Sequence, residues 1–204
     1  KVVALLQDSK VDTALALAKK LVEKSQDESD YLLVSDIYIS QKKHEEALKY
    51  LEGGYAKEYS EKILERMATL MYVNLERKKD AIAYLETHTR VHGCSVLICK
   101  KLISFYGYDK NLDGLLSAYL RYYKIDPNEE VSAQIVRLYG YKQEFGKLML
   151  FLEDSRSDDK MLLRLYINSK NYEKAYPLSK KLYYETGDVK YLGESVIFEY
   201  ESAP

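Results

Sequence analysis

The stretch THTRVHGC holds the residues of this chain that could most readily bind a metal ion. His88 and His92 are four residues apart, which is about one helical turn, and Cys94 follows them. Imidazole and thiolate groups are ligands that zinc prefers, so these three residues are candidates for a metal site. The repeat pattern described below argues against such a site, because it places His88 on the packing side of a helix that ends at Gly93. We therefore expect no cofactor.

The other stretches that could carry catalysis lack an essential residue. GYKQEFGKL resembles a phosphate-binding loop, but Leu148 stands where a serine or threonine would hold Mg²⁺. HEEAL lacks the second histidine of the zinc-protease motif. We therefore predict no enzyme within these residues.

Composition excludes further classes of protein. Three prolines and nine glycines in 204 residues are too few for the turns of a β-sandwich. A formal net charge of −1 argues against a nucleic-acid surface, and no apolar run reaches the roughly 18 residues of a membrane span. Because the chain begins with Lys1, we interpret it as a piece of a longer protein. Its compartment stays open: cytoplasmic or, if a leader was removed, exported.

A tyrosine recurs along the chain with a period close to 34 residues. The tyrosines are Tyr38, Tyr72, Tyr106, Tyr139, Tyr166 and Tyr200. Nine residues after the first five stands a small or aliphatic residue: Ala47, Ala81, Leu115, Leu148 and Ala175. An earlier copy has Leu5 in the tyrosine position and Ala14 nine residues later. A period of this length is typical of an array of helical hairpins.

The spacing inside each copy predicts two helices. In YLLVSDIYIS, Tyr31, Val34 and Tyr38 fall on one helical stripe, and HEEALKYL continues with a second stripe after a short polar connector. The alanine lets the two helix backbones approach closely, and the tyrosine ring covers the junction. One hairpin cannot bury its apolar face alone, so neighbouring hairpins must cover one another. Cys99 falls on a packing face, where we expect a free, buried thiol.

At these positions the sequence resembles the tetratricopeptide repeat family. The match is carried in residues 28–61 by Tyr31, Val34, Ser35, Tyr38, Ala47, Leu51 and Gly54, and by Pro127 at a later repeat end. The resemblance implies an all-α fold, an α-solenoid in which about six antiparallel helix hairpins form a right-handed superhelix. We expect one repeat domain over 1–204, with units 1–27, 28–61, 62–95, 96–128, 129–155 and 156–189 and a terminal helix at 190–204.

Counted from Leu5, the fifth interval, from Tyr139 to Tyr166, is seven residues short. Leu148 lies 18 residues before Tyr166, whereas Ala47 lies 25 residues before Tyr72. We expect the missing residues in the second helix of the fifth unit or in the loop that follows it. We predict a local change of superhelical pitch near residue 155, with simple trimming of the loop as the alternative.

The family resemblance also implies a place for a partner. In that family, certain positions of each first helix line a concave face that takes a peptide or a helix. The matching residues here include Arg66, Asn74, Lys100, Lys101, Tyr108, Arg137, Tyr141, Arg164 and Asn168. Basic residues outnumber acidic ones at these positions, which favours an acidic partner, unless the charges only solvate the helices.

These observations leave several hypotheses for the function. The leading one is a non-catalytic scaffold that binds another protein or peptide. The first alternative is self-association as a homodimer, through Val196, Phe198 and Tyr200 of the terminal helix, unless that helix folds back as a cap. A second alternative is an accessory repeat region of a larger enzyme. Reading of RNA is disfavoured by the near-neutral charge.

Overall fold

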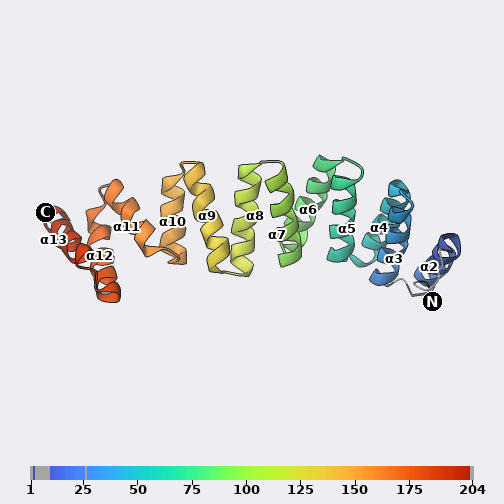
Figure 1. Cartoon of the computed structure of the whole chain (residues 1–204), viewed down its shortest axis with the longest axis horizontal. Helices are drawn as coiled ribbons and strands as arrows, with labels where there is room; N and C mark the ends of the chain where they lie inside the picture. Colours follow the sequence, from blue (N-terminus) through green and yellow to red (C-terminus); the bar gives the residue numbers. More distant parts are fainter. Residues whose placement is uncertain (1, 3–9, 26, 203–204) are drawn as a thin grey trace. The chain divides into compact units, whose positions relative to one another are not determined.

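The structure, a computed structural model, describes residues 2, 10–25 and 27–202. The described residues form helices and no strand (Figure 1). They fall into two compact units, Lys1–Asp126 and Pro127–Pro204, and each is considered by itself below. Leu5 of the early repeat copy lies outside the described residues, whereas Ala14 of the same copy is described and is fully buried. Within the described ranges, no helix is both long enough and apolar enough to span a bilayer.

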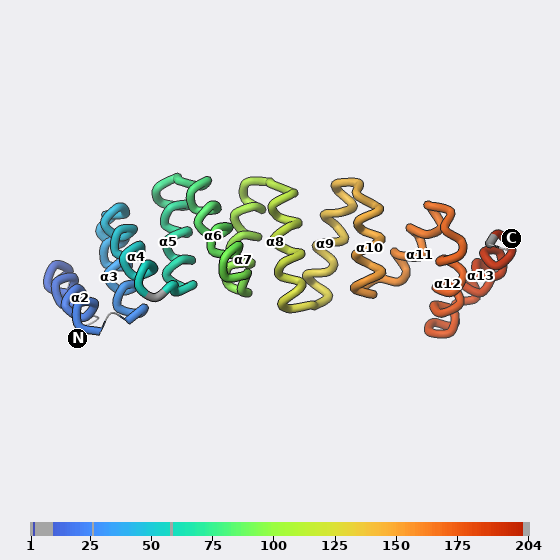
Figure 2. The backbone as a smooth tube through the Cα atoms, turned by 180° about the vertical axis from the view of Figure 1, so that it is seen from behind, coloured from blue at the N-terminus to red at the C-terminus, as the bar shows by residue number. Residues whose placement is uncertain are grey.

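Consecutive helices pack on one another in chain order within each unit, as the repeat pattern predicts (Figure 2). The first unit contains α2 (Val11–Ser25), α3 (Glu28–Ser40), α4 (His44–Glu58), α5 (Glu61–Val73), α6 (Lys78–His92), α7 (Val96–Tyr108) and α8 (Leu112–Ile125). The second unit contains α9 (Glu129–Tyr141), α10 (Phe145–Ser155), α11 (Asp159–Asn168), α12 (Tyr172–Thr186) and α13 (Val189–Ser202). The first helices of successive hairpins, α3, α5 and α7, also touch. The all-α array of stacked hairpins is thus confirmed.

Short polar residues start the first helix of each complete hairpin. Ser60 Oγ accepts the backbone N–H of Ile63 at 3.2 Å, and Asn128 Oδ1 accepts that of Val131 at 3.0 Å. The same kind of cap occurs at Asp27, Ser95 and Asp158. Such caps satisfy backbone donors that have no partner inside the helix. The positions at which the helices begin are therefore encoded locally.

One turn geometry joins the two helices of every complete hairpin. A non-glycine residue with φ between 55° and 60° occupies each turn: Lys42, Glu76, Lys110, Gln143 and Lys170. In four of the five turns, the next residue donates its backbone N–H to the carbonyl of the repeated tyrosine, as from Asn111 to Tyr106 at 2.9 Å. The tyrosine therefore fixes the turn through its backbone as well as its ring.

The residue nine positions after each tyrosine lies at a helix junction, as predicted. Ala47, Ala81 and Ala175 are fully buried. In the fourth repeat the position holds Leu115, and the preceding Gly114 makes the close approach instead. A Cβ atom added to Gly114 would lie 2.5 Å from Cε1 and 2.8 Å from Cγ of Tyr106. The small residue has thus moved by one position in this hairpin.

Two repeated tyrosines bind a carboxylate of the preceding hairpin. Tyr106 donates its hydroxyl to Glu86 Oε1 at 2.7 Å, and the guanidinium of Arg121 contacts both oxygens of Glu86 at 2.8 and 2.9 Å. In the second unit, Tyr166 donates to Glu153 Oε1 at 2.6 Å, and Lys174 Nζ lies 2.8 Å from the same oxygen. These hydroxyls therefore join neighbouring hairpins through hydrogen bonds to charged groups.

We expect the Glu86 cluster to contribute stability that is lost in acid. Burial alone would raise the pKa of Glu86, but hydrogen bonds from Arg121 and Tyr106 outweigh burial and hold this pKa below its ordinary value of 4.5. A carboxyl with a lowered pKa stabilises the fold above its ordinary pKa, and the effect disappears as the pH falls through the folded value. The gap in unfolding free energy between the wild type and Glu86→Gln should therefore shrink between about pH 7 and pH 3. Urea titrations across this range would measure it, and a constant gap would contradict the expectation.

Helices α10 and α11 share the deletion in the fifth interval. α10 has 11 residues, against 15 in α4, and α11 has 10, against 13 in α5. The expectation that only the second helix or its loop is shortened is therefore wrong. Each of two consecutive helices is shorter by about one turn, which keeps both packing faces in register. A change of pitch near residue 155 stays a prediction.

Helix α13 folds back along α12. Ser179 Oγ donates to the carbonyl of Tyr191 at 2.7 Å, and the rings of Tyr172 and Phe198 stack with centroids 5.7 Å apart. Phe198 is therefore buried against α12 and is not available to a second chain, as expected for a terminal helix that folds back as a cap. Val196 and Tyr200 are 61% and 83% exposed, so a homodimer through this other face of α13 stays a prediction.

Candidate partner-binding groove

A groove of about 710 Å³ lies in the first unit between α5 and α7. Its lining consists of Thr69, Tyr72, Val73, Glu76, Lys78, Lys101, Ser104, Phe105 and Tyr108. Because α5 and α7 are the first helices of successive hairpins, the groove occupies the kind of position that the family resemblance predicts for a partner.

Two stacked aromatic rings form the floor of this groove. The rings of Tyr72 and Phe105 lie 4.0 Å apart and only 6° from parallel. The Tyr72 hydroxyl donates to Asp109 Oδ1 at 2.6 Å. Burial, together with this carboxylate, raises the pKa of Tyr72 to about 12. The phenol is therefore held protonated near neutral pH, as a rigid structural donor.

The rim of the groove combines exposed apolar side chains with amines. Val73 and Tyr108 are 63% and 78% exposed. Lys101 forms an ion pair with Glu65 of α5, and Lys78 Nζ lies 3.8 Å from Asp109 and 5.1 Å from the centre of the Tyr72 ring. The rim can therefore offer both apolar contact and hydrogen-bond donors to an extended chain.

Only some of the predicted partner-binding residues in Lys1–Asp126 lie in the groove. Lys101 and Tyr108 line the groove, whereas Arg66, Asn74 and Lys100 are not part of its lining. Arg66 forms an ion pair with Asp36 at 3.1 Å, and Lys100 lies 5.4 Å from the ring centre of Tyr122 on α8. Carboxylates on the neighbouring first helices therefore engage part of the predicted basic charge.

The predicted residues of the second unit lie on its first helices and are exposed. Arg137 and Tyr141 belong to α9, and Tyr141 is 73% exposed. Arg164 and Asn168 belong to α11. Arg137 Nη1 contacts Gln134 Oε1 at 3.5 Å. Their role in binding stays a prediction.

Sequence reasoning placed Lys101, Ser104 and Tyr108 on the binding face but missed the other six lining residues of this groove: Thr69, Tyr72, Val73, Glu76, Lys78 and Phe105. Val73 occupies a family position that could have been carried over, whereas Phe105 is buried and lies in the floor of the groove. Thr69 lies one turn before Val73 on the same helix. Lys78 begins α6, a second helix, so a rule restricted to first helices cannot find it.

The histidines and cysteines do not assemble the candidate metal site. Cys94 is joined to Cys99 in a disulfide, so the thiolate ligand is absent and Cys99 is not the free thiol that was expected. His88 is buried, as predicted; its Nδ1 lies 2.8 Å from the Tyr55 hydroxyl and its Nε2 lies 3.4 Å from Glu61. Both ring nitrogens of His88 therefore have structural partners. Over the described ranges, no group of three metal-binding side chains was found.

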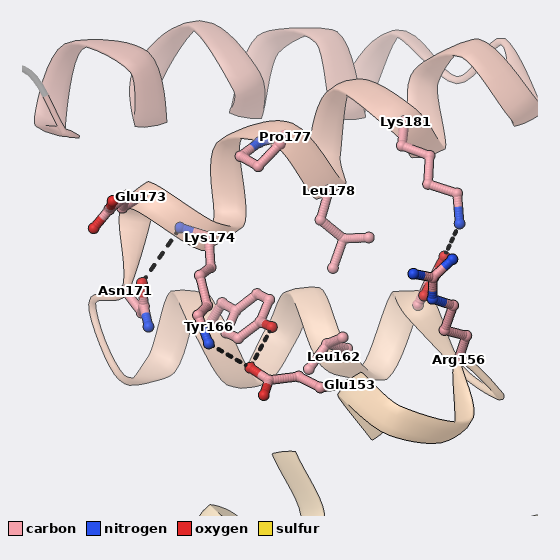
Figure 3. A pocket seen from close by; sticks show the side chains of 11 residues that line it. Glu153, Arg156, Leu162, Tyr166, Asn171, Glu173, Lys174, Pro177, Leu178 and Lys181 are labelled. Atoms are coloured by element: carbon pink, nitrogen blue, oxygen red, sulfur yellow. Dashed lines mark hydrogen bonds and ion pairs between the residues drawn. The ribbon is translucent and has the colours of Figure 1, made fainter. Parts of the chain in front are cut away.

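A second hollow, of about 620 Å³, lies among α10, α11 and α12 (Figure 3). Lys174 pairs with Glu153 at 2.8 Å and Lys181 with Asp159 at 2.5 Å, while Leu162 and Leu178 lie between these pairs (Figure 3). Because the groove between α5 and α7 carries the exposed apolar side chains of Val73 and Tyr108, we place the candidate site there.

Several solved structures are similar to this chain. A tetratricopeptide repeat protein from Parabacteroides merdae is 15% identical over 90% of this chain and 73% of its own, with a TM-score of 0.45. YrrB, described as a TPR protein with an unusual peptide-binding site, is 20% identical over 83% and 88%, with a TM-score of 0.46. PilF of Pseudomonas aeruginosa is 13% identical over 98% and 94%, with a TM-score of 0.48. No family model and no curated protein sequence matches the chain.

The assignment of the fold rests on the hairpins themselves. The described helices form hairpins in chain order. The connector of each complete hairpin contains one non-glycine residue in the left-handed region of backbone conformation. The tyrosine period of about 34 residues coincides with these units. The described residues form an all-α array of stacked helical hairpins, whose repeat pattern resembles the tetratricopeptide repeat.

Proposed function

We propose that the chain is a non-catalytic scaffold whose groove between α5 and α7 holds an extended segment of a partner protein. The observation that carries this proposal is the exposure of Val73 and Tyr108 beside the stacked rings of Tyr72 and Phe105. Exposed apolar and aromatic side chains around a preformed hollow are typical of protein interaction sites. A rigid floor also lowers the entropy lost on binding.

The amines of the rim favour a partner segment that carries a carboxylate. The Lys78 side chain is 54% exposed, and its contact with Asp109 at 3.8 Å is long for an ion pair. Exposed pairs of this kind contribute little energy, so Lys78 can turn to a second carboxylate at small cost. Lys101 is 23% exposed and remains with Glu65, so we assign it the role of positioning the rim.

A photo-crosslinking amino acid tests where the partner lies. Benzoylphenylalanine in place of Tyr108 should capture a partner from an extract of the native source, and the product can be identified by mass spectrometry. The same group in place of Tyr59, which is 60% exposed and lies outside the groove, is the control. Equal capture of the same protein from both positions would remove the groove from the proposal.

A matched pair of valines then tests the contact itself. Val73→Asp should weaken binding of the captured partner about tenfold or more, because it places a charge in an apolar contact. Val91→Asp is the control, since Val91 is 70% exposed on α6 and does not line the groove. Titration of each purified variant with the labelled partner would measure both affinities. Equal affinities for the two variants would contradict the proposal.

A further inference from the structure

We propose that Cys94 and Cys99 form a reversible redox site, in which Cys94 exchanges with external thiols and disulfides and Cys99 is the resolving cysteine. The two residues are joined in the structure, with Cα atoms 5.8 Å apart and a sequence separation of five. This Cα separation is ordinary for a disulfide, so the pair can close with the helices in place. The proposal does not depend on whether the groove between α5 and α7 binds a partner.

The two sulfurs differ in access. Cys94 lies in the connector between α6 and α7, next to the exposed Gly93, and is partly exposed. Cys99 lies in α7 and is fully buried. Thiol–disulfide exchange requires direct approach of one sulfur to another. An external reagent can therefore reach Cys94 but not Cys99 while the protein remains folded.

The position of Cys94 also favours its reactivity. Cys94 directly precedes Ser95, the N-cap of α7, whose Oγ accepts the backbone N–H of Ile98 at 3.3 Å. The N-terminus of a helix carries a partial positive charge, which stabilises a nearby thiolate. Cysteines at such positions react faster because a larger fraction is ionised at neutral pH. Burial among apolar side chains has the opposite effect on Cys99.

The exchange proceeds in two balanced steps with a low-molecular-weight disulfide such as oxidised glutathione. The Cys94 thiolate attacks one glutathione sulfur, forms a mixed disulfide and releases one glutathione thiolate. Cys99 then attacks the Cys94 sulfur and releases the second glutathione, whose sulfur takes up the Cys99 proton. Two protein thiols are oxidised and one glutathione disulfide is reduced, and an excess of reduced glutathione reverses both steps.

Oxidation links the connector to the first turns of α7. The same helix supplies Lys101, Ser104 and Tyr108 to the groove lining. The redox state of the cysteines therefore affects α7, which forms one wall of the groove. The oxidised protein should show slower amide hydrogen exchange over residues 95–100 than the reduced protein, because the covalent link suppresses local opening.

Single-cysteine variants of the full chain test the proposed asymmetry. With oxidised glutathione at neutral pH, Cys99→Ser should form a mixed disulfide at Cys94 at least about tenfold faster than Cys94→Ser forms one at Cys99. Intact-mass spectrometry would follow both reactions, and circular dichroism would confirm that each variant is folded. Equal rates in folded variants, or faster reaction of Cys99, would overturn the proposal.

A measurement on the wild type covers the case in which a variant does not fold. The fully reduced chain is treated briefly with iodoacetamide, and the alkylated residue is identified by peptide mapping. Cys94 should carry at least about nine-tenths of the first label, in line with a tenfold difference in rate. Titration with mixtures of reduced and oxidised glutathione should then close and reopen the disulfide. Label divided equally, or a disulfide that never reopens in the folded protein, would overturn the proposal.

Discussion

Glu86→Ala is expected to lower the free energy of unfolding by about 2–4 kcal/mol, because it removes an anion that serves three donors. The Tyr106 hydroxyl and both terminal nitrogens of Arg121 bind this carboxylate at 2.7 to 2.9 Å. The side chains of Arg121 and Glu86 are only 25% and 27% exposed, so water can replace these bonds only in part. The substitution also leaves the guanidinium without its anion next to the core.

Urea denaturation at neutral pH measures this loss, and an exposed ion pair provides the control. Glu45 is 64% exposed and lies 3.7 Å from Arg77, so Glu45→Ala should cost less than about 1 kcal/mol. The single and double variants of Glu86 and Tyr106 form a cycle that isolates their coupling. A cost for Glu86→Ala no larger than that for Glu45→Ala would show that the cluster does not stabilise the fold.

Gly114→Ala should destabilise the protein by about 1–3 kcal/mol, although alanine is normally the better helix former. The gain in helix propensity is worth at most about 1 kcal/mol. Against this gain stands the Tyr106 ring, whose Cε1 and Cγ atoms would lie 2.5 and 2.8 Å from the new Cβ. These ring atoms are held by the bond to Glu86, so the ring cannot move away freely. The clash therefore outweighs the propensity.

The matched control for Gly114 is Gly107, which lies inside α7 with nothing within 4 Å of an added Cβ. Gly107→Ala should stabilise the protein by about 0.5–1 kcal/mol. Thermal or urea unfolding of the two variants should thus give changes of opposite sign. If both substitutions stabilise the protein, the close approach at Gly114 is not a constraint.

Much of the fold could be predicted because its determinants are local. The tyrosine period, the short polar caps and the polar connectors each act within one hairpin, so a single sequence displays them. The carboxylate partners of the tyrosines could not be predicted in the same way. Glu86 reaches Tyr106 from the preceding hairpin, 20 residues earlier, and the spacing of one hairpin does not show which side chains of its neighbour it will meet. Only the packed arrangement selects one of them.

The deletion in the fifth interval shows a second limit. A missing stretch of seven residues matches about two helical turns, and removing one turn from each of two helices preserves the same apolar pattern. The sequence pattern therefore could not show that both α10 and α11 are shortened. The helix ends depend instead on Arg156, which has φ 51°, and on the cap formed by Asp158.

The candidate groove was predicted only in part, for a related reason. A position in the repeat fixes the face on which a side chain lies, and it found Lys101 and Tyr108. The repeat position does not show which side chains lie next to it. It therefore could not reveal that Arg66 is paired with Asp36 and is not a free cation. Nor could it pair Cys94 with Cys99, because their contact depends on where the connector ends and α7 begins.

The five connector residues with positive φ, in the left-handed region of backbone conformation, also indicate which substitutions this chain could accept. The backbone of a non-glycine residue in that region is less favourable by roughly 1 kcal/mol, a cost that glycine does not carry. The five turns belong to five different hairpins, so glycine or asparagine could be accepted at each one without disturbing the others. Substitutions in the connectors alone could therefore raise the free energy of unfolding, without any change in the residues of the packed faces.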